Sequence, residues 1–245
     1  MSRAPAFAPD PGSRAAALLE AARAARGFMP DEEGLHLSDL ARRVADDDLL
    51  PHRIVEVGAY CGRSTLYLAA GLAASEPRGG ALPVLFSLDH HHGSEENQAG
   101  WAHHEPDLVD ARTGLFETLP HWRRAVDDAG AGDLVVGVVG FSAQVAANWE
   151  TPLGAVFIDG GHGDDPAWAD YRGWSPLVAP GGLLAIHDVF ADPRDGGRPP
   201  YEIYCAALDS GLFREEPALS SGSLRVLRRG APKAQSEQSE QSQRS

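Results

Sequence analysis

Residues 53–68 read RIVEVGAYCGRSTLYL, and this stretch decides the fold of the rest of the chain. The segment Ile54 to Val57 is rich in β-branched apolar residues, which a buried strand favours. A tight turn from Gly58 to Gly62 follows, and apolar residues then recur at helical spacing. Ser64 and Thr65 are predicted to cap this helix. A strand, a glycine turn and a helix together predict one βα unit of an α/β fold.

The turn also predicts a ligand site, because free backbone N–H groups at a helix N-terminus attract anions. A dinucleotide fingerprint needs a third glycine, and Tyr60 would crowd a pyrophosphate. A Walker loop ends in Gly-Lys-Ser/Thr, whereas this turn ends in Gly62-Arg63-Ser64. A small carboxylate with an amine suits the turn better, because Glu56 can hold the ammonium. S-adenosylmethionine carries both groups. A βα turn without any ligand is the alternative.

Length, charge and cysteine content narrow the function classes. The chain has 245 residues, and we expect a single domain over residues 13–230 between disordered ends at 1–12 and 231–245. A net charge of −14 argues against nucleic acid as a partner. No apolar run is long enough for a membrane helix, and no secretory signal is recognisable. The 2 cysteines predict free thiols in a reducing cytoplasm.

Alternating strand and helix patterns predict a doubly wound, mostly parallel sheet of seven strands, with helices on both faces. Two helices, from Ser13 to about Arg26 and from Ser38 to Leu49, come before the first strand. They could cover the ligand mouth or form a dimer contact. We expect the protein to be a homodimer. The later predicted strands are 84–89, 133–139, 155–159, 183–188 and a possible hairpin of 212–216 and 223–227. The later predicted helices are 115–129, 143–149, 166–178 and 201–210.

Polar residues end four of these strands, although core strands have no packing reason to finish on acids. They are Glu56, Asp89, Asp159 and the pair His187-Asp188. Ligands of such sheets bind at the carboxyl ends of the strands. Asp89 can accept hydrogen bonds from both ribose hydroxyls of an adenosine, or it can simply cap the next helix. Ser142, after the third strand, can meet an adenine edge or belong to an ordinary turn.

Asp159, His187 and Asp188 predict a site for a hard divalent ion, Mg²⁺ or Mn²⁺. Zinc would favour more histidine or cysteine ligands. His162 lies three residues beyond Asp159, and an imidazole near neutral pH suits a general base that deprotonates a hydroxyl. A hydrogen-bonded structural histidine is the alternative.

The segment from His90 to Asp110 is polar and lacks periodicity, so we interpret it as a long functional loop. Its run of histidines suggests a metal cluster, but adjacent side chains cannot all point inward. We therefore expect recognition of substrate hydroxyls by one or two residues, such as His91 or Glu95.

Three stretches resemble class I S-adenosylmethionine-dependent methyltransferases of the methyltransferase-24 branch. They are residues 55–65 (VEVGAYCGRST), 157–162 (FIDGGH) and 174–189, which contains WSPL, PGG and IHDV. The resemblance covers residues 53–189 and implies a Rossmann-like methyltransferase fold. Relatives include magnesium-dependent O-methyltransferases of antibiotic and sugar pathways, with metal ligands at an Asp after the fourth strand and an acid pair after the fifth. Asp159 and Asp188 match these positions, while His187 replaces the first acid of the pair.

The predicted reaction is therefore methyl transfer to a hydroxyl of a small molecule, a sugar or polyol, with His162 as the base. The chain is also similar to actinobacterial sugar methyltransferases, including the 1-O-methyltransferase type of mycobacterial methylmannose polysaccharide synthesis. A metal-dependent hydrolase and a non-catalytic sensor of an adenosine ligand are the alternatives. The predicted cofactor-binding residues are Glu56, Gly58, Tyr60, Cys61, Gly62, Ser64, Asp89, Ser142 and Asp159.

Overall fold

The computed structural model describes residues 7–75, 83–98, 100, 104–161 and 163–231. The outermost parts of the two predicted disordered ends lie outside these residues. Phe7, inside the predicted leader, is 5% exposed and belongs to the larger hydrophobic core. Phe7 therefore packs on the domain although it lies within the predicted leader, residues 1–12, of which residues 1–6 lie outside the described part of the chain. Among the described residues, no helix is long and apolar enough to span a membrane.

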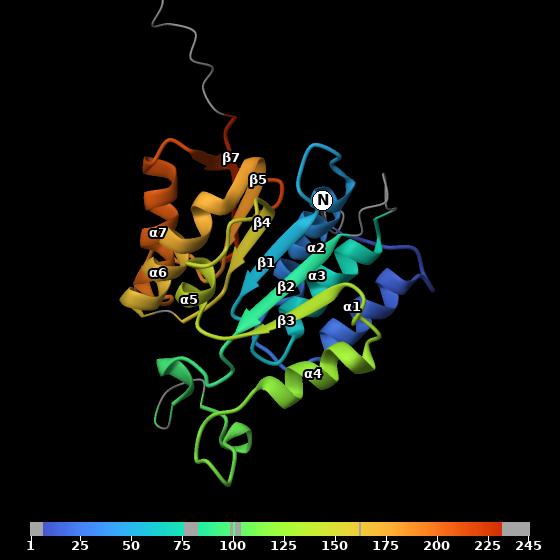
Figure 1. Ribbon diagram of the computed structural model, residues 1–245, viewed down its shortest axis with the longest axis vertical. Coiled ribbons are helices and arrows are strands. Elements are labelled where there is room, and N and C mark those ends of the chain that lie inside the picture. Colours follow the sequence, from blue (N-terminus) through green and yellow to red (C-terminus); the bar gives the residue numbers. More distant parts are fainter. Residues whose placement is uncertain (1–6, 76–82, 99, 101–103, 162, 232–245) are drawn as a thin grey trace, which may run out of the picture.

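One sheet of seven strands forms the centre of the domain (Figure 1). Its strands are β1 (Arg53–Val57), β2 (Val84–Asp89), β3 (Val135–Val139), β4 (Leu153–Ile158), β5 (Val178–Ile186), β6 (Phe213–Glu215) and β7 (Arg225–Arg229). They lie in the order β3-β2-β1-β4-β5-β7-β6. The first five are parallel, and β7 is antiparallel to both β5 and β6. The predicted doubly wound sheet and terminal hairpin are confirmed. The order reverses between β1 and β4, where such folds bind ligands.

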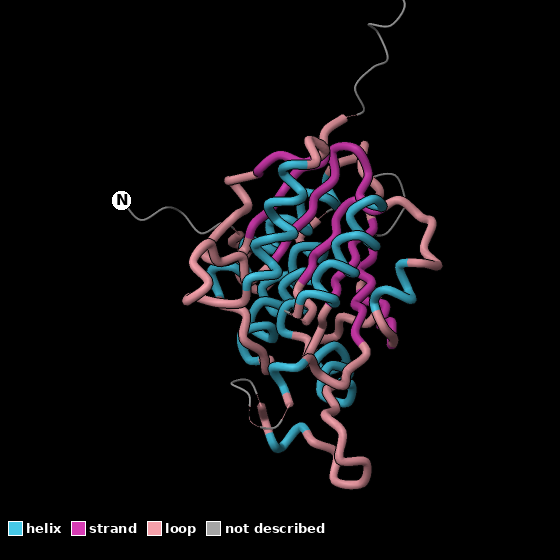
Figure 2. The backbone as a smooth tube through the Cα atoms, turned by 90° about the vertical axis from the view of Figure 1, so that its left-hand side faces the viewer, coloured by secondary structure: helices cyan, strands magenta, loops and turns pink. Residues whose placement is uncertain are grey.

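Helices cover both faces of the sheet. They are α1 (Arg14–Ala24), α2 (Asp31–Asp46), α3 (Arg63–Ala73), α4 (Leu119–Asp128), α5 (Ser142–Ala146), α6 (Asp164–Trp174) and α7 (Arg198–Asp209), with short 3₁₀ turns at Glu95–Asn97, Pro106–Leu108 and Ser175–Leu177. Side chains of α1 to α4 share one core, and those of α5 to α7 share the other. Figure 2 shows helices in front of the strands on the α5 to α7 side. Along β1, Ile54 packs into the first core, while Val55 and Val57 pack into the second, as period-two alternation requires.

Helices α2 and α3 pack so closely that one backbone nearly touches the other. A Cβ atom at Gly71 would lie 2.1 Å from the carbonyl oxygen of Ser38. The buried Ser38 hydroxyl donates a hydrogen bond to the carbonyl of Tyr67, at 2.7 Å. Ser38 is therefore an interior contact residue of α2, which begins at Asp31, and the prediction that it caps a helix is wrong.

Replacing Gly71 by alanine is expected to destabilise the protein by about 1–3 kcal/mol. The added methyl group overlaps the carbonyl oxygen of Ser38, which can move only if the backbone of α2 moves with it. Urea denaturation measures the loss. Gly132 offers a matched control, since a Cβ atom there meets nothing within 4 Å. Equal effects of G71A and G132A would contradict the close packing of α2 on α3.

Other differences from the predicted elements have local causes. Ser64 and Thr65 lie inside α3, whose N-cap is Gly62 with a φ of 96°, and no side chain caps it. The predicted helix 115–129 begins only at Leu119, because Phe116 bridges Val109 in an antiparallel pairing. The predicted helix 143–149 is shorter in the structure, where α5 runs from Ser142 to Ala146.

Candidate active site

Two adjoining cavities lie at the carboxyl edge of the parallel strands. The smaller, of about 280 Å³, is lined by residues at the ends of β1 to β4, among them Asp89 and Ser142. The larger, of about 840 Å³, lies between the start of α2, the turn after β1 and the loops after β5 and before β7. Gly58, Tyr60 and Asp159 line both cavities. The convergence of strand ends that the sequence predicts is therefore present.

The glycine turn is pressed against the end of β4. A Cβ atom at Gly58, whose φ is 93°, would lie 2.1 Å from the carbonyl oxygen of Asp159. Only glycine permits this approach, which brings β1 and β4 together at the point where the strand order reverses.

Asp89 organises the backbone of this turn. Its Oδ2 accepts hydrogen bonds from the backbone N–H groups of Ala59 at 3.0 Å and Tyr60 at 2.8 Å. Its Oδ1 accepts from the N–H of His91 at 2.7 Å. Two of the N–H groups expected to hold a ligand carboxylate are therefore bound to Asp89, although Gly58 and Tyr60 still line both cavities.

Tyr60 is held between the turn and a distant loop. Its φ of 46° is unusual for a residue with a side chain. Its hydroxyl donates to Glu105, which also accepts from Arg26 at 2.5 Å. Its ring stacks on Phe116 at a centroid distance of 6.2 Å. These contacts fix the ring as a shared wall of both cavities.

The far end of the smaller cavity combines aromatic and polar groups. Phe141 is exposed, and its ring lies 4.9 Å from that of His90. The Ser142 hydroxyl accepts a hydrogen bond from the indole N–H of Trp174 at 2.7 Å. Burial raises the pKa of nearby Asp170 to about 6, against the lowering effect of a hydrogen bond from Ser142. An aromatic face beside hydrogen-bonding groups suits a planar base such as adenine.

Glu56 lies away from both cavities. Its side chain is 0% exposed, and Oε2 accepts hydrogen bonds from Thr65 at 2.6 Å and Ser87 at 2.7 Å. It does not line either cavity. Strand alternation places it on the same face as Ile54, toward α3 and α4, while Val57 borders the smaller cavity. Burial raises its pKa to about 7. The structure thus gives the carboxyl group an internal role, in contrast to the predicted contact with an ammonium group.

Glu56→Gln is expected to stabilise the protein above pH 7. A folded pKa of about 7 exceeds the unfolded value of about 4.5, so Glu56 favours folding below pH 4.5, and this stability is lost as the pH rises through 7. The neutral amide avoids that loss, so the advantage of the variant over the wild type should grow from near zero at pH 4.5 to about 3 kcal/mol at pH 8.

Urea denaturation in metal-free buffer at several pH values measures this gain, with exposed Glu150→Gln as the control. Parallel pH curves for E56Q and the wild type would contradict the titration. A loss of S-adenosylhomocysteine affinity in E56Q would instead favour the predicted ammonium contact.

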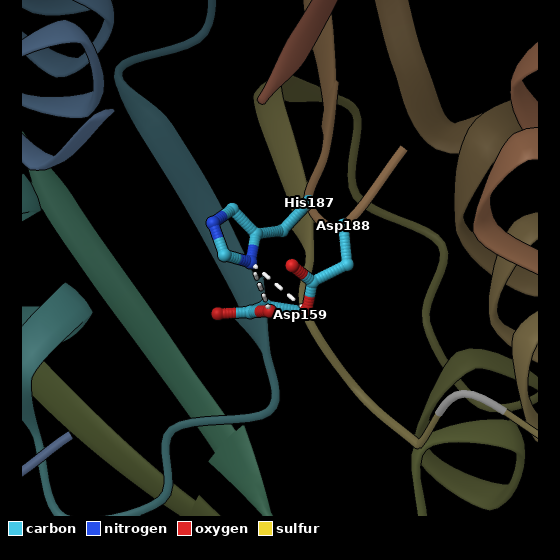
Figure 3. Close-up of side chains that lie close together, drawn as sticks. All are labelled: Asp159, His187 and Asp188. Carbon is cyan, nitrogen blue, oxygen red and sulfur yellow. Dashed lines mark ion pairs between the residues drawn. The ribbon is translucent and has the colours of Figure 1, made fainter. Parts of the chain in front are cut away.

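The predicted metal ligands do come together. Asp159, His187 and Asp188 offer ligand atoms that all lie within 4.8 Å of one another. Figure 3 shows the three side chains pointing toward a common point. His187 Nδ1 lies 3.1 Å from Asp159 Oδ1 and 3.4 Å from Asp188 Oδ2. These separations suit a divalent ion, because two atoms bound to one ion at about 2.1 Å lie roughly 3.0–3.4 Å apart.

A fourth side chain, that of Glu33, contacts the cluster although it is distant in the sequence. His187 Nε2 lies 2.5 Å from Oε2 of Glu33, which is 154 residues away on α2. Glu33 Oε1 accepts from the backbone N–H of Ser223 at 2.6 Å. Both side chains are buried. Burial alone would lower the pKa of His187, but Asp159, Asp188 and Glu33 raise it well above its ordinary value. The three carboxylates demand a positive charge at this point, which a proton or a metal ion can supply.

Three further residues predicted to bind the cofactor are absent from the lining of the smaller cavity. Cys61 is buried and packs with Leu108 and Phe116, and burial raises its pKa to about 12. Gly62 lies beneath α4, where a Cβ atom would meet Ala125 and Trp122. Ser64 lines the larger cavity.

The predicted substrate-binding residues are also displaced. His91 is buried, and its Nδ1 pairs with the Thr118 hydroxyl at 2.8 Å. Glu95 is exposed and absent from both linings, which contain its neighbours Ser94 and Asn97 instead. His162, the predicted base, lies outside the described residues.

Sequence reasoning missed Glu33. The apolar stripe of α2 runs through Leu37, Leu40 and Val44, and Glu33 lies four residues before Leu37 on the same face. A carboxylate on a buried stripe is a signal that could have identified it.

Comparison with known proteins gives a family match and a set of similar folds. The family model described as a methyltransferase domain matches residues 55–189. The chain is similar to the SAH-bound methyltransferase PaMTH1 of Podospora anserina, with 15% identity, a TM-score of 0.59 and coverage of 92% of this chain and 90% of that chain. It is also similar to an O-methyltransferase from Bacillus cereus in complex with SAH, with 17% identity, a TM-score of 0.55 and coverage of 89% and 90%.

A third similar structure is the O-methyltransferase TomG from Streptomyces achromogenes, which is involved in tomaymycin synthesis and was solved with SAM. It shares 16% identity, with a TM-score of 0.56 and coverage of 92% of each chain. This likeness confirms the predicted Rossmann-like fold over nearly the whole chain.

Proposed function

The chain belongs to the methyltransferase domain family, and we propose that it transfers the methyl group of S-adenosylmethionine to a hydroxyl oxygen of a small sugar-like acceptor. The observation that carries the proposal is the junction of the two cavities. Asp159 lines both and lies at 3.1 Å from His187 in the cluster with Asp188. A donor in one cavity and an acceptor in the other would meet at this residue, and such placement supplies much of the rate enhancement.

The smaller cavity fits the cofactor. S-adenosylmethionine supplies, when bound, an electrophilic methyl group on a sulfonium sulfur. Asp89 borders the cavity where a ribose would lie, and Phe141 and Ser142 border its far end. Gly58 lets the turn lie against β4 and lines both cavities. The protein's part is to bind the cofactor and to aim its methyl group at the acceptor.

The larger cavity fits a polar acceptor. Phe28 and Phe190 offer aromatic faces, and Asn97, Asp195 and Ser223 offer hydrogen-bonding groups, as a sugar ring with several hydroxyls requires. Asp159, His187 and Asp188 would hold a divalent ion, which the sequence predicts to be Mg²⁺ or Mn²⁺. Such an ion, when bound, would orient the acceptor oxygen and lower the pKa of its hydroxyl. The role of His162 as the base stays a prediction.

The alternatives lack comparable support. A hydrolase would leave the smaller cavity and Asp89 without a role, and a sensor would leave the metal-type cluster without one. A homodimer and a cytoplasmic location also stay predictions.

Two measurements test the proposal. Calorimetric titration with S-adenosylhomocysteine should show binding at one site per chain. A screen of sugar and polyol acceptors with methyl-labelled S-adenosylmethionine should then show label on an acceptor oxygen, and EDTA should abolish the transfer. Binding of the nucleoside without transfer to any hydroxyl acceptor would favour the sensor.

A further inference from the structure

We propose that the Asp159–His187–Asp188 cluster selects a first-row transition-metal ion over Mg²⁺, and that Glu33 is the positioning residue that turns the His187 nitrogen toward this ion. The inference rests on the proposed function, because it concerns the ion that the acceptor would meet.

The first step is the tautomer of His187. A carboxylate can only accept hydrogen bonds, so the contact of 2.5 Å to Glu33 places a proton on Nε2. When an ion takes the place of the proton that Asp159 and Asp188 favour on Nδ1, the imidazole is neutral and Nδ1 offers its lone pair to the ion. Nδ1 is the atom that faces Asp159 and Asp188, at 3.1 and 3.4 Å. A histidine ligand whose other N–H is held by a carboxylate is the arrangement that metal sites use to orient the ring.

The second step is the rigidity of Glu33. Its Oε1 accepts from the Ser223 backbone N–H at 2.6 Å, which leaves Oε2 for the imidazole. Glu33 and His187 are 5% and 6% exposed. A carboxylate with each oxygen bonded and little contact with water cannot easily turn away, so the Nε2–H tautomer is maintained.

The third step is ligand chemistry. Mg²⁺ favours oxygen ligands and is seldom bound by imidazole, whereas Co²⁺, Ni²⁺ and Zn²⁺ accept nitrogen readily, and Mn²⁺, which also favours oxygen, accepts an imidazole beside carboxylates. Asp159 and Asp188 supply oxygen ligands that all of these ions accept. His187 is therefore the member of the cluster that decides between the two classes.

The selectivity is tested with full-length, tag-free protein. We expect Mn²⁺ to bind at least about 100-fold more tightly than Mg²⁺. Electron paramagnetic resonance measures the binding of Mn²⁺, and competition against Mn²⁺ measures the binding of Mg²⁺. Co²⁺ should give absorption bands that report nitrogen coordination. An Asp159→Asn/Asp188→Asn double variant sets the baseline from histidines elsewhere in the chain. His187→Asp restores an oxygen ligand, so the preference for Mn²⁺ should fall at least about tenfold. An unchanged preference in H187D, or Mg²⁺ binding as tight as Mn²⁺ binding in the wild type, would overturn the inference.

The role of Glu33 is tested with Glu33→Gln and, as a matched control, Glu32→Gln, which changes the exposed neighbouring residue. A glutamine amide can donate to Nε2 and thereby favour the Nδ1–H tautomer, which has no lone pair for the ion. E33Q should weaken Mn²⁺ binding by about 10–100-fold, and E32Q should leave it unchanged.

A merely structural role for Glu33 is excluded by repeating E33Q in the H187D background. There is no tautomer to set in that background, so the same substitution should change Mn²⁺ affinity by less than about threefold. An equal loss in both backgrounds would refute the positioning role. If E33Q fails to fold, the comparison of H187D with the wild type still tests the metal class.

Failure of the inference and failure of the proposed function are distinguishable. Methyl transfer supported by Mg²⁺, without a preference for Mn²⁺, would refute the inference and leave the function standing. Selective Mn²⁺ binding without methyl transfer to any hydroxyl acceptor would refute the function and leave the metal site standing.

Discussion

Asp159→Asn is expected to lower methyl-transfer turnover by about 10³-fold. Asp159 lines both cavities, and its Oδ1 faces His187 Nδ1 at 3.1 Å. Asparagine keeps the shape but loses the negative charge that would hold the ion, and a bound ion stabilises a developing oxyanion by several kcal/mol, which corresponds to this factor.

Initial rates with a saturating acceptor measure the loss, and calorimetry with S-adenosylhomocysteine shows whether the cofactor still binds. Asp164→Asn is the control, because this aspartate lies in the exposed first turn of α6. Turnover of D159N within threefold of the wild type would remove Asp159 from the catalytic machinery.

Asp89→Asn is expected to weaken S-adenosylhomocysteine binding by about 100-fold or more. The carboxylate accepts three backbone hydrogen bonds, from Ala59, Tyr60 and His91. An asparagine NH₂ group cannot accept, so at least one N–H loses its partner, and the turn that borders both cavities shifts. Hydrogen bonds to a charged group contribute about 1.5–3 kcal/mol each, which makes the loss large.

Asp110→Asn provides the matched control. Asp110 Oδ1 also accepts three hydrogen bonds, from Arg112 N and from the N and hydroxyl of Thr113, in an exposed loop that lines neither cavity. Both variants should lose some stability in urea, but D89N alone should lose affinity. Unchanged affinity in D89N would show that the turn keeps its shape without the carboxylate and that the ribose is held elsewhere.

The sheet could be predicted because its strands carry strong local signals. Residues 84–89 and 53–57 are short apolar runs next to glycine or acidic residues, and both appear as β2 and β1. Helix caps could not be predicted in the same way. Ser38 and Ser64 have the residue type of a cap, but each is buried, and Ser38 finds its partner on another helix. A short pattern cannot reveal a partner supplied by tertiary packing.

The site residues also differ in whether a local pattern or a distant contact positions them. The meeting of Asp159 with His187 and Asp188 follows from parallel strand ends that share one edge, so it could be predicted. Glu33 could not be located, because its contact with His187 spans 154 residues. The sequence predicts Glu56 at the mouth because it lies at the end of a strand. Alternation along the strand does not reveal which of its two faces borders the cavity.

The two cavities draw their walls from different parts of the chain. Apart from shared residues such as Gly58 and Asp159, the smaller one is built between Val57 and Asp170, whereas the larger one adds Arg26 to Glu33 and His187 to Ser223. Under the proposed function, the acceptor pocket could therefore change in evolution while the cofactor pocket is inherited intact. Substitutions at Phe28, Phe190 or Asp195 could redirect such an enzyme to a new acceptor without rebuilding its methyl donor site.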